Sequence, residues 1–198
     1  MKFHFISLDK ELPSLFRKHF GDLPNFSCSV GDIRDYPSVD CLVSPANSFG
    51  LMDGGIDLYL SAMVSKNPDD LGGIVRKKIL KEYSGEQPVG TCIIIETGNK
   101  KYPFLAHSPT MITPMVVNGT LQAYYPFKAT LEAIKKHNEG KGLKIRTVLT
   151  TTFCTGCGKM PLETSLKQMR YAYDVVESPR NNNWDSANEH VIELSKLT

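Results

Sequence analysis

Hydrophobic and polar residues repeat along the chain with two different periods. Short segments with alternating or unbroken apolar residues predict β-strands, and longer segments with apolar residues three and four positions apart predict helices. The predicted strands are 2–8, 26–30, 39–43, 92–97, 104–107 and 145–153. The predicted helices are 11–20, 55–65, 69–83, 120–134, 162–176 and 184–197. Because strands and helices alternate, we expect a layered α/β domain.

The clearest helical periodicity lies in the second half of the chain. Apolar residues recur three and four positions apart through 120–134 and again through 162–176. Such stripes are more often core-facing sides of helices than ligand contacts. The chain has no internal repeat, low-complexity segment or domain linker, which predicts one domain over residues 1–198. Residues 178–198 are expected to form a C-terminal extension with a loop and then a short helix.

Composition and charge narrow the class of protein. Of the 198 residues, 41% are apolar and 22% are charged, which is typical of a soluble globular protein and not of a disordered one. A formal net charge of +2, without a dense Lys/Arg stripe, argues against direct sequence-specific binding to nucleic acid. No apolar run approaches the roughly 20 residues of a membrane helix, so no membrane partner is expected.

The N-terminus and the cysteines indicate the compartment. The opening sequence MKFHFISLDKEL lacks the charged, apolar and cleavage regions of a secretory signal. Five cysteines, an odd number scattered along the chain, do not resemble a disulfide framework. We therefore expect an intracellular, cytoplasmic protein.

A glycine-containing loop, Asn47–Gly55, follows the predicted strand 39–43. Gly50, Gly54 and Gly55 allow its backbone to approach a ligand closely. Backbone N–H groups at the start of the next helix can then bind an anion with help from the helix dipole. The glycines alone are equally compatible with a turn that binds nothing.

A second loop, Thr155–Lys159, follows the predicted strand 145–153. Gly156 and Gly158 supply backbone freedom, and Lys159 adds a cation. The spacing is not that of a P-loop. Since both loops follow strands and precede helices, they are expected at the carboxyl edge of the sheet, where open α/β folds bind ligands. Together they predict a grip on the phosphates of one nucleotide-like ligand.

Cys154 and Cys157 near this loop allow another hypothesis, half of a zinc site or a redox dithiol. A structural zinc site needs four ligands, and the sequence offers no second closely spaced pair. We therefore predict no metal site.

Three polar side chains flank the two loops. Asp32 follows the predicted strand 26–30, where it can accept a hydrogen bond from an exocyclic amine or cap a turn. Asn47 comes just after a strand, and Asp57 lies ten residues later, near the start of a helix whose dipole it can also complement. Asn47 and Asp57 together can orient a sugar hydroxyl and a water molecule.

The order of these motifs resembles the macro domain family, which binds ADP-ribose. The matching segments are Gly31-Asp32-Ile33, VDCLVSPAN at 39–47, GGID at 54–57 and TTFCTGCGKMP at 151–161. The likeness extends over residues 26–177. It implies a three-layer α/β/α fold with a central mixed, mostly parallel sheet.

The resemblance also implies a role for each matching residue. Asp32 would bind the adenine amine, Ile33 would line the adenine pocket, and Asn47 would contact the distal ribose. The diphosphate would lie between Ser48, Gly50, Asp53, Gly54, Gly55 and Ile56 on one side and Thr155, Gly156, Cys157, Gly158 and Lys159 on the other. Family members that hydrolyse mono-ADP-ribose esters carry an aspartate at the position of Asp57, so Asn47 and Asp57 are the expected catalytic residues. No metal or other cofactor is implied.

The sequence departs from the family pattern at several positions, among them Cys154 and Cys157, which replace small or aliphatic residues. Ser44-Pro45-Ala46-Asn47 stands where the family usually has Asn-Ala-Ala-Asn. Asp53 replaces a glycine and would repel a diphosphate unless it points outward. Lys159 replaces a frequent glycine and can offset that charge.

The resemblance implies a hydrolase of ADP-ribosyl linkages. Its substrates would be mono-ADP-ribosylated protein or nucleic acid, O-acetyl-ADP-ribose or ADP-ribose phosphate. The alternative is a non-catalytic module that reads ADP-ribose. A zinc or redox protein that uses Cys154 and Cys157 is the third hypothesis.

Overall fold

Six strands form one mixed sheet in the computed structural model, which describes residues 1–198 apart from the side chains of Pro68 and Asp69. The strands are β1 (Lys2–Ser7), β2 (Phe26–Val30), β3 (Cys41–Ser44), β4 (Ile93–Glu96), β5 (Phe104–His107) and β6 (Thr147–Thr150). Their order is β2-β1-β6-β3-β5-β4, and all neighbours pair in parallel except β4, which runs antiparallel to β5. The predicted mixed, mostly parallel sheet is confirmed.

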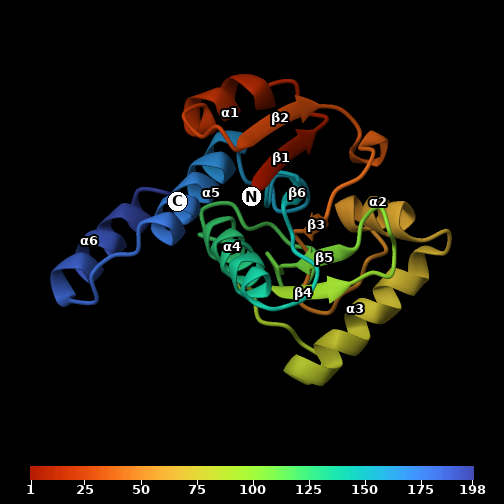
Figure 1. Cartoon of the computed structure of the whole chain (residues 1–198). Helices are drawn as coiled ribbons and strands as arrows, with labels where there is room; N and C mark the ends of the chain where they lie inside the picture. The colour runs from red at the N-terminus through yellow and green to blue at the C-terminus, as the bar shows by residue number, and fades with distance from the viewer.

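Helices cover both faces of this sheet and make three layers (Figure 1). One face carries α1 (Leu12–Phe20), α4 (Tyr124–Glu139) and α5 (Leu162–Glu177), and the other carries α2 (Gly55–Val64) and α3 (Pro68–Tyr83). A short 3-10 helix, η1 (Ile33–Asp35), follows β2, and α6 (Trp184–Ser195) comes last. Over the described part of the chain, no helix is both long enough and apolar enough to span a membrane. The expected α/β/α fold is confirmed.

The alternation of side chains along each strand divides the core in two. In β3, Cys41 and Val43 pack with α1, α4 and α5, whereas Leu42 packs with α2 and α3. All three side chains are fully buried, because a parallel sheet in this architecture is covered on both faces.

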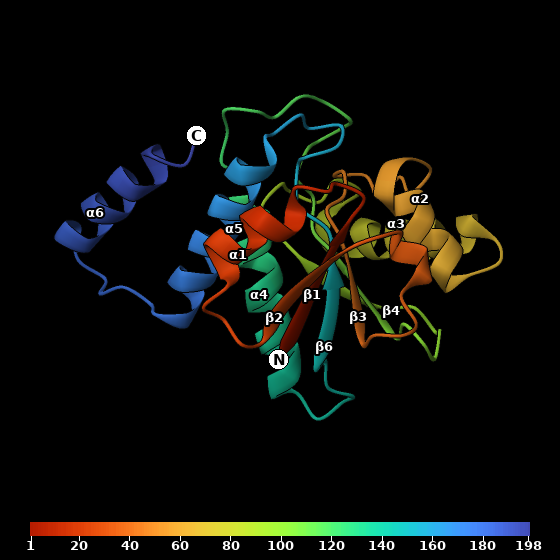
Figure 2. The same cartoon turned by 90° about the horizontal axis from the view of Figure 1, so that it is seen from above.

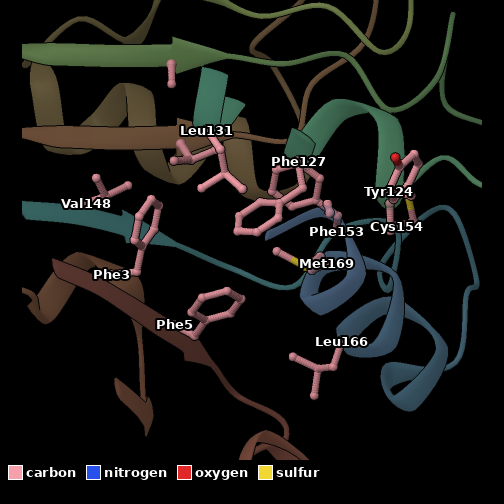
Figure 3. Close-up of a cluster of buried hydrophobic side chains, with 14 of the residues drawn as sticks. Phe3, Phe5, Tyr124, Phe127, Leu131, Val148, Phe153, Cys154, Leu166 and Met169 are labelled. Atoms are coloured by element: carbon pink, nitrogen blue, oxygen red, sulfur yellow. The ribbon is translucent and has the colours of Figure 1, made fainter. Parts of the chain in front are cut away.

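Aromatic rings dominate the core between the sheet and the layer of α1, α4 and α5. The ring centre of Phe5 lies 5.3 Å from that of Phe20 and 6.1 Å from that of Phe127. Phe127 in turn meets Phe153 edge-on at 5.6 Å. Figure 3 shows Phe5, Phe127 and Phe153 gathered beside α4 and α5. Leu131 and Leu166, from the two predicted apolar stripes, are buried in the same core.

The core between the sheet and the layer of α2 and α3 is mostly aliphatic. Its buried members are Ile6, Ile33, Val39, Leu42, Met52, Leu60, Leu71, Val75, Ile79, Ile93, Ile95, Tyr102, Leu105 and Leu149. Helix α2 reaches this core from the end of β3, so its first turn lies near the carboxyl edge of the sheet.

Two predicted elements have other bounds than the periodicity suggested: one helix begins later and ends at Glu139, and one strand is shorter. The chain forms a turn before α4, in which the Thr120 hydroxyl donates to the Val117 carbonyl at 2.6 Å, so the helix starts at Tyr124 and not at residue 120. The strand predicted over 145–153 is paired only within β6. The Asn138 side chain binds both backbone groups of Ile145 before that strand, and after it the chain leaves the sheet as a loop.

The C-terminal helix α6 lies at the outside of the molecule, next to α5 (Figures 1 and 2). Leu194 and Leu197 are buried against the aromatic core. His190 lies between two tyrosine hydroxyls, 2.9 Å from that of Tyr171 and 3.3 Å from that of Tyr124. Trp184, at the start of α6, remains 83% exposed.

Candidate functional site

The carboxyl ends of three adjacent strands meet at one edge of the sheet. Strands β6, β3 and β5 are parallel neighbours, so the loops that follow them converge. These loops span 45–54 after β3, 108–123 after β5 and 151–161 after β6, and Figure 2 shows the last two beside each other. Backbone hydrogen bonds join them: the Thr110 N–H donates to the Ala46 carbonyl at 2.9 Å, and the Val117 N–H donates to the Gly158 carbonyl at 2.8 Å.

The three loops enclose a pocket of about 380 Å³, within the size range of small-molecule sites. The first loop and the start of α2 contribute Pro45, Ala46, Asn47, Leu51, Asp53, Gly54, Gly55, Ile56 and Asp57. The loop after β5 contributes Thr110, Met111 and Pro114. The loop after β6 contributes Thr151, Thr152, Cys154, Thr155, Gly156, Cys157 and Gly158. The structure thus brings the two glycine loops together around one cavity.

Several lining residues are not among those that the sequence predicts for the ligand. They are Pro45, Ala46, Thr110, Met111, Pro114, Thr151, Thr152 and Cys154. Apolar and hydroxyl side chains carry no chemical signature in a sequence. Their position in the sequence is informative, because each lies at the end of a predicted strand or in the loop that follows it. Ligands of open α/β folds bind at the carboxyl ends of strands. The loop after the predicted strand 104–107 is therefore also expected at the pocket, and its residues from Thr110 to Pro114 form one wall.

Asp32 and Ile33 lie outside the pocket lining. The Asp32 carboxylate caps η1 by accepting from the Arg34 backbone N–H at 2.9 Å, and it also binds the Arg34 guanidinium. The side-chain hydrogen bonds from Arg34, followed by the backbone one, lower the pKa of Asp32 to about 2. The same guanidinium lies 4.8 Å from the ring centre of Tyr59 on α2. Ile33 is buried in the aliphatic core and does not line the open cavity.

Ser48, Gly50 and Lys159 also lie outside the lining. Ser48 is buried, and its carbonyl accepts from a backbone N–H. Gly50 adopts φ +66°, and a Cβ there would lie 2.7 Å from the Val75 side chain of α3, so only glycine fits. Lys159 is exposed with φ +54°. Ser48 and Gly50 therefore support the conformation of the first loop on the side away from the pocket.

Asp57 is the buried carboxyl group of the pocket. It lies in the first turn of α2, is 5% exposed, and accepts a hydrogen bond from the Ser44 hydroxyl at 2.6 Å. Burial raises its pKa to about 6; the bond from Ser44 acts in the opposite direction, and the charge of Asp53 adds to the rise. Ser44, which departs from the family pattern, therefore holds the expected catalytic aspartate.

Asn47 uses most of its side chain to shape the first loop. Its Nδ2 donates to the Leu51 carbonyl at 2.8 Å. Its Oδ1 accepts from the backbone N–H groups of Phe49 at 3.1 Å and Leu51 at 3.2 Å. Since an amide nitrogen carries two protons, one N–H of Asn47 takes no part in these bonds.

Among the described residues, the pocket lining contains two carboxyl groups, Asp53 and Asp57, and no Lys, Arg or His. An anionic ligand there would be bound by neutral donors, namely backbone N–H groups and the threonine hydroxyls of the lining. The first N–H groups of a helix have no intrahelical acceptor, so the start of α2 offers such donors. The second glycine loop offers others. A Cβ on Gly158 would lie 2.5 Å from the Cys154 carbonyl oxygen, so this loop closes only around glycine.

Comparison with known families identifies this architecture. Residues 43–169 match the sequence model of the Macro domain. The chain belongs to the macro domain family. An uncharacterized protein of Aquifex aeolicus (strain VF5) is 31% identical over 132 residues, which cover 66% of this chain and 70% of that protein. The resemblance seen in the motifs is confirmed.

Solved macro domains share the fold at low sequence identity. The macrodomain of Mycobacterium tuberculosis DarG superposes with a TM-score of 0.58 and 19% identity, over 74% of this chain and 88% of that chain. The Oceanobacillus iheyensis macrodomain with ADP gives a TM-score of 0.55 and 18% identity, over 85% of this chain and 90% of that chain. At these identities the likeness establishes the fold.

In this macro domain the two cysteines of the second loop differ in environment. Cys154 is buried with φ +64°, and its thiol donates to the Gln122 carbonyl at 3.2 Å. Burial raises the pKa of Cys154 to about 12, which disfavours the thiolate needed for zinc binding or disulfide exchange. Cys157 is exposed. Among the described residues, no three His, Cys, Asp or Glu side chains are grouped to hold a metal ion.

Proposed function

We propose that this macro domain binds ADP-ribose, either free or attached to a macromolecule. The pocket volume suits such a ligand, and the Oceanobacillus iheyensis macrodomain of the same fold was solved with ADP. The diphosphate would lie between the start of α2 and the second glycine loop, where backbone N–H groups can bind it. Asp53 is exposed, so its charge is screened by water in the open pocket.

The adenine would lie toward Asp32, at the end of β2. Both oxygens of that carboxylate bind Arg34, so the adenine amine would share or displace this ion pair. An exposed ion pair is weak, which makes the displacement easy. Arg34 over the Tyr59 ring would then form a flat surface next to the base.

We further propose that the domain hydrolyses ADP-ribosyl linkages. The observation that carries this proposal is Asp57, a buried carboxyl group that lines the pocket and is held by Ser44 at 2.6 Å. With a pKa of about 6, it is mostly ionised above pH 7 and still basic enough to accept a proton. Few surface carboxylates combine these properties.

In the proposed reaction, a water molecule attacks the anomeric carbon of the distal ribose. The water oxygen forms the new bond to carbon as the bond to the acceptor oxygen breaks, and the water proton passes to Asp57. An acceptor carboxylate leaves as an anion and needs no proton, and Asp57 then releases its proton to solvent. The free N–H of Asn47 would hold a ribose hydroxyl in position.

The Asp57→Asn variant tests the catalytic role. Asparagine has the same size and can still accept from Ser44, so ADP-ribose should bind within a few-fold of the parent. Turnover of a mono-ADP-ribosylated protein should fall about 10²–10⁴-fold, the usual effect of losing a general base. Asp53→Asn, in the same pocket, is the matched control and should retain turnover. Equal rates for Asp57→Asn and the parent would overturn the catalytic proposal.

The second candidate function is a non-catalytic reader of ADP-ribose. The commitment of the Asn47 side chain to the loop favours it, because only one N–H is left for substrate. Calorimetric titration with ADP-ribose, with Asp32→Ala as a weakened control, separates the outcomes. Binding without turnover would identify a reader, and no heat at millimolar ligand would overturn both candidates.

A further inference from the structure

A buried histidine lies beside the Ser44–Asp57 pair. Ser44 of β3 and His107 of β5 are register partners on adjacent parallel strands, which lie about 4.8 Å apart in such sheets. Both side chains are 0% exposed. Leu42 and Leu105, two positions earlier on the same strands, pack in the aliphatic core, so Ser44 and His107 face the same side, toward α2.

Gln87 fixes the orientation of the His107 ring. The amide nitrogen of Gln87 donates to the Thr91 hydroxyl at 3.1 Å and to the His107 carbonyl at 3.2 Å. Its oxygen therefore faces His107 Nδ1, at 2.8 Å, and Nδ1 carries the proton.

The other ring nitrogen of His107, Nε2, is a hydrogen-bond acceptor. Burial lowers the pKa of His107 to about 3, so the ring is neutral and Nε2 offers a lone pair. Among the described residues, this buried Nε2 has no hydrogen-bond partner. A buried polar group left unpaired is costly, so a state in which a neighbouring hydroxyl donates to Nε2 would be favoured.

We propose that His107 is the second acceptor for the Ser44 hydroxyl and, through it, a positioning residue for Asp57; its catalytic consequence rests on the proposed hydrolysis. When Asp57 is ionised, the single proton of the Ser44 hydroxyl points to Asp57. When Asp57 is protonated, its O–H donates to Ser44 Oγ, and the Ser44 hydroxyl moves toward His107 Nε2 and donates to it, a contact that is absent while Asp57 is the acceptor. No covalent bond changes. This movement satisfies both acceptors in turn and stabilises Asp57 after it has taken a proton.

Other charged or titratable side chains lie near α2. They are Asp53 in the first loop, Arg34 and Asp35 on η1, Tyr59 on α2 itself, and Arg76 on α3 next to Gly50. Of these, Asp53 acts on Asp57 and raises its pKa. Arg34 is bound to Asp32.

The first experiment needs no variant. NMR of the ligand-free parent protein would follow the Asp57 carboxyl carbon and His107 Nε2 from pH 4 to pH 8. We expect the Nε2 resonance to move with the same midpoint as Asp57, because its hydrogen bond forms when Asp57 is protonated. A constant Nε2 resonance while Asp57 titrates would overturn the proposal.

A pair of substitutions at His107 then removes and restores the acceptor. His107→Asn places an amide nitrogen near Nδ1, so it keeps the contact with Gln87 and deletes Nε2. The pKa of Asp57 should fall by about one pH unit, as expected for the loss of one neutral hydrogen bond to the protonated state. His107→Gln places an amide group near Nε2 and should return the Asp57 midpoint toward that of the parent. Identical midpoints in the His107→Asn variant and the parent would contradict the relay.

The Ser44→Ala background separates a relay from a general effect of the histidine on its surroundings. Without the hydroxyl, His107→Asn should leave the Asp57 midpoint unchanged, whereas an effect through packing or burial would persist. These readouts do not depend on turnover. Coupling without turnover would support the relay and remove the hydrolase proposal; turnover without coupling would do the reverse.

Discussion

The two faces of the central sheet differ in what they bury. Toward α1, α4 and α5, the sheet packs aromatic rings such as Phe5, Phe127 and Phe153 against one another. Toward α2 and α3, the core is aliphatic, and at the pocket edge it contains Asp57 and His107 in buried positions. Buried polar groups on the first face, such as Gln168 and Ser165 of α5, bond to backbone groups, whereas the second face buries a carboxyl group and an imidazole.

The raised pKa of Asp57 gives the free-energy cost of burying its charged form. A carboxyl group whose pKa rises from 3.8 to about 6 is disfavoured in its charged form by about 3 kcal/mol. That is a large fraction of the stability of a typical domain. Packing on the aromatic face therefore helps to offset the burial of Asp57 on the pocket face.

The largest effect is expected on the aromatic face. Phe127→Ala should lower the free energy of unfolding by about 3–5 kcal/mol, because the ring is 0% exposed and its loss leaves a cavity. Urea unfolding measures the change. Leu80→Ala, on an exposed position of α3, should cost no more than about 0.5 kcal/mol. Similar losses at both sites would contradict the role given to this face.

Replacing Asp57 should raise the free energy of unfolding, whereas replacing Phe127 should lower it. Its folded-state pKa lies above its unfolded value, so its contribution is absent below pH 3.8, becomes increasingly unfavourable up to about pH 6, and is constant above that. Between pH 3 and pH 8, Asp57→Asn should therefore gain about 3 kcal/mol in free energy of unfolding relative to the parent. Denaturant unfolding at several pH values checks this. A parallel pair of stability curves would show that Asp57 is not strained by burial.

The second glycine loop should give a smaller change in stability with a clear effect on binding. Gly158→Ala forces a Cβ against the Cys154 carbonyl, which should cost about 1–3 kcal/mol and displace the N–H groups that face the pocket. ADP-ribose affinity should fall at least about tenfold in calorimetry, equivalent to losing one good contact. Gly156→Ala is the control in the same loop, since a Cβ there meets nothing within 4 Å. Equal affinity losses in both variants would argue against a geometric cause.

The smallest effect is expected outside both faces. Trp184 is 83% exposed at the start of α6, so Trp184→Ala should change the free energy of unfolding by no more than about 0.5 kcal/mol. ADP-ribose affinity should not change. A loss of affinity would connect α6 to the pocket and extend the comparison to a third region.

Much of the fold could be predicted from the sequence because local patterns are strong. The apolar stripes of α4 and α5 and the β-branched run of β6 are periodic signals that tertiary packing reinforces. The limits of these elements were less certain. The turn at Thr120 and the binding of the Ile145 backbone by the Asn138 side chain depend on hydrogen bonds that periodicity does not encode.

The site was predicted in part. The order of the motifs placed Asn47, Asp57 and Gly158 at one edge of the sheet, and they do line one pocket. The pairing of Asp32 with Arg34 and the burial of Ile33 were not foreseen, because a motif states which residues are present and not what their side chains contact.

The family, the alternation of strands and helices, and the two glycine loops at strand ends can all be predicted from the order of residues. Which polar groups lose their contact with water depends on the folded arrangement. Ser44 looked like the loss of a family amide, yet the fold sets its hydroxyl on Asp57 and places it in register with His107. Burial and neighbours set the pKa and the partners of such groups, and both arise from residues distant in the chain.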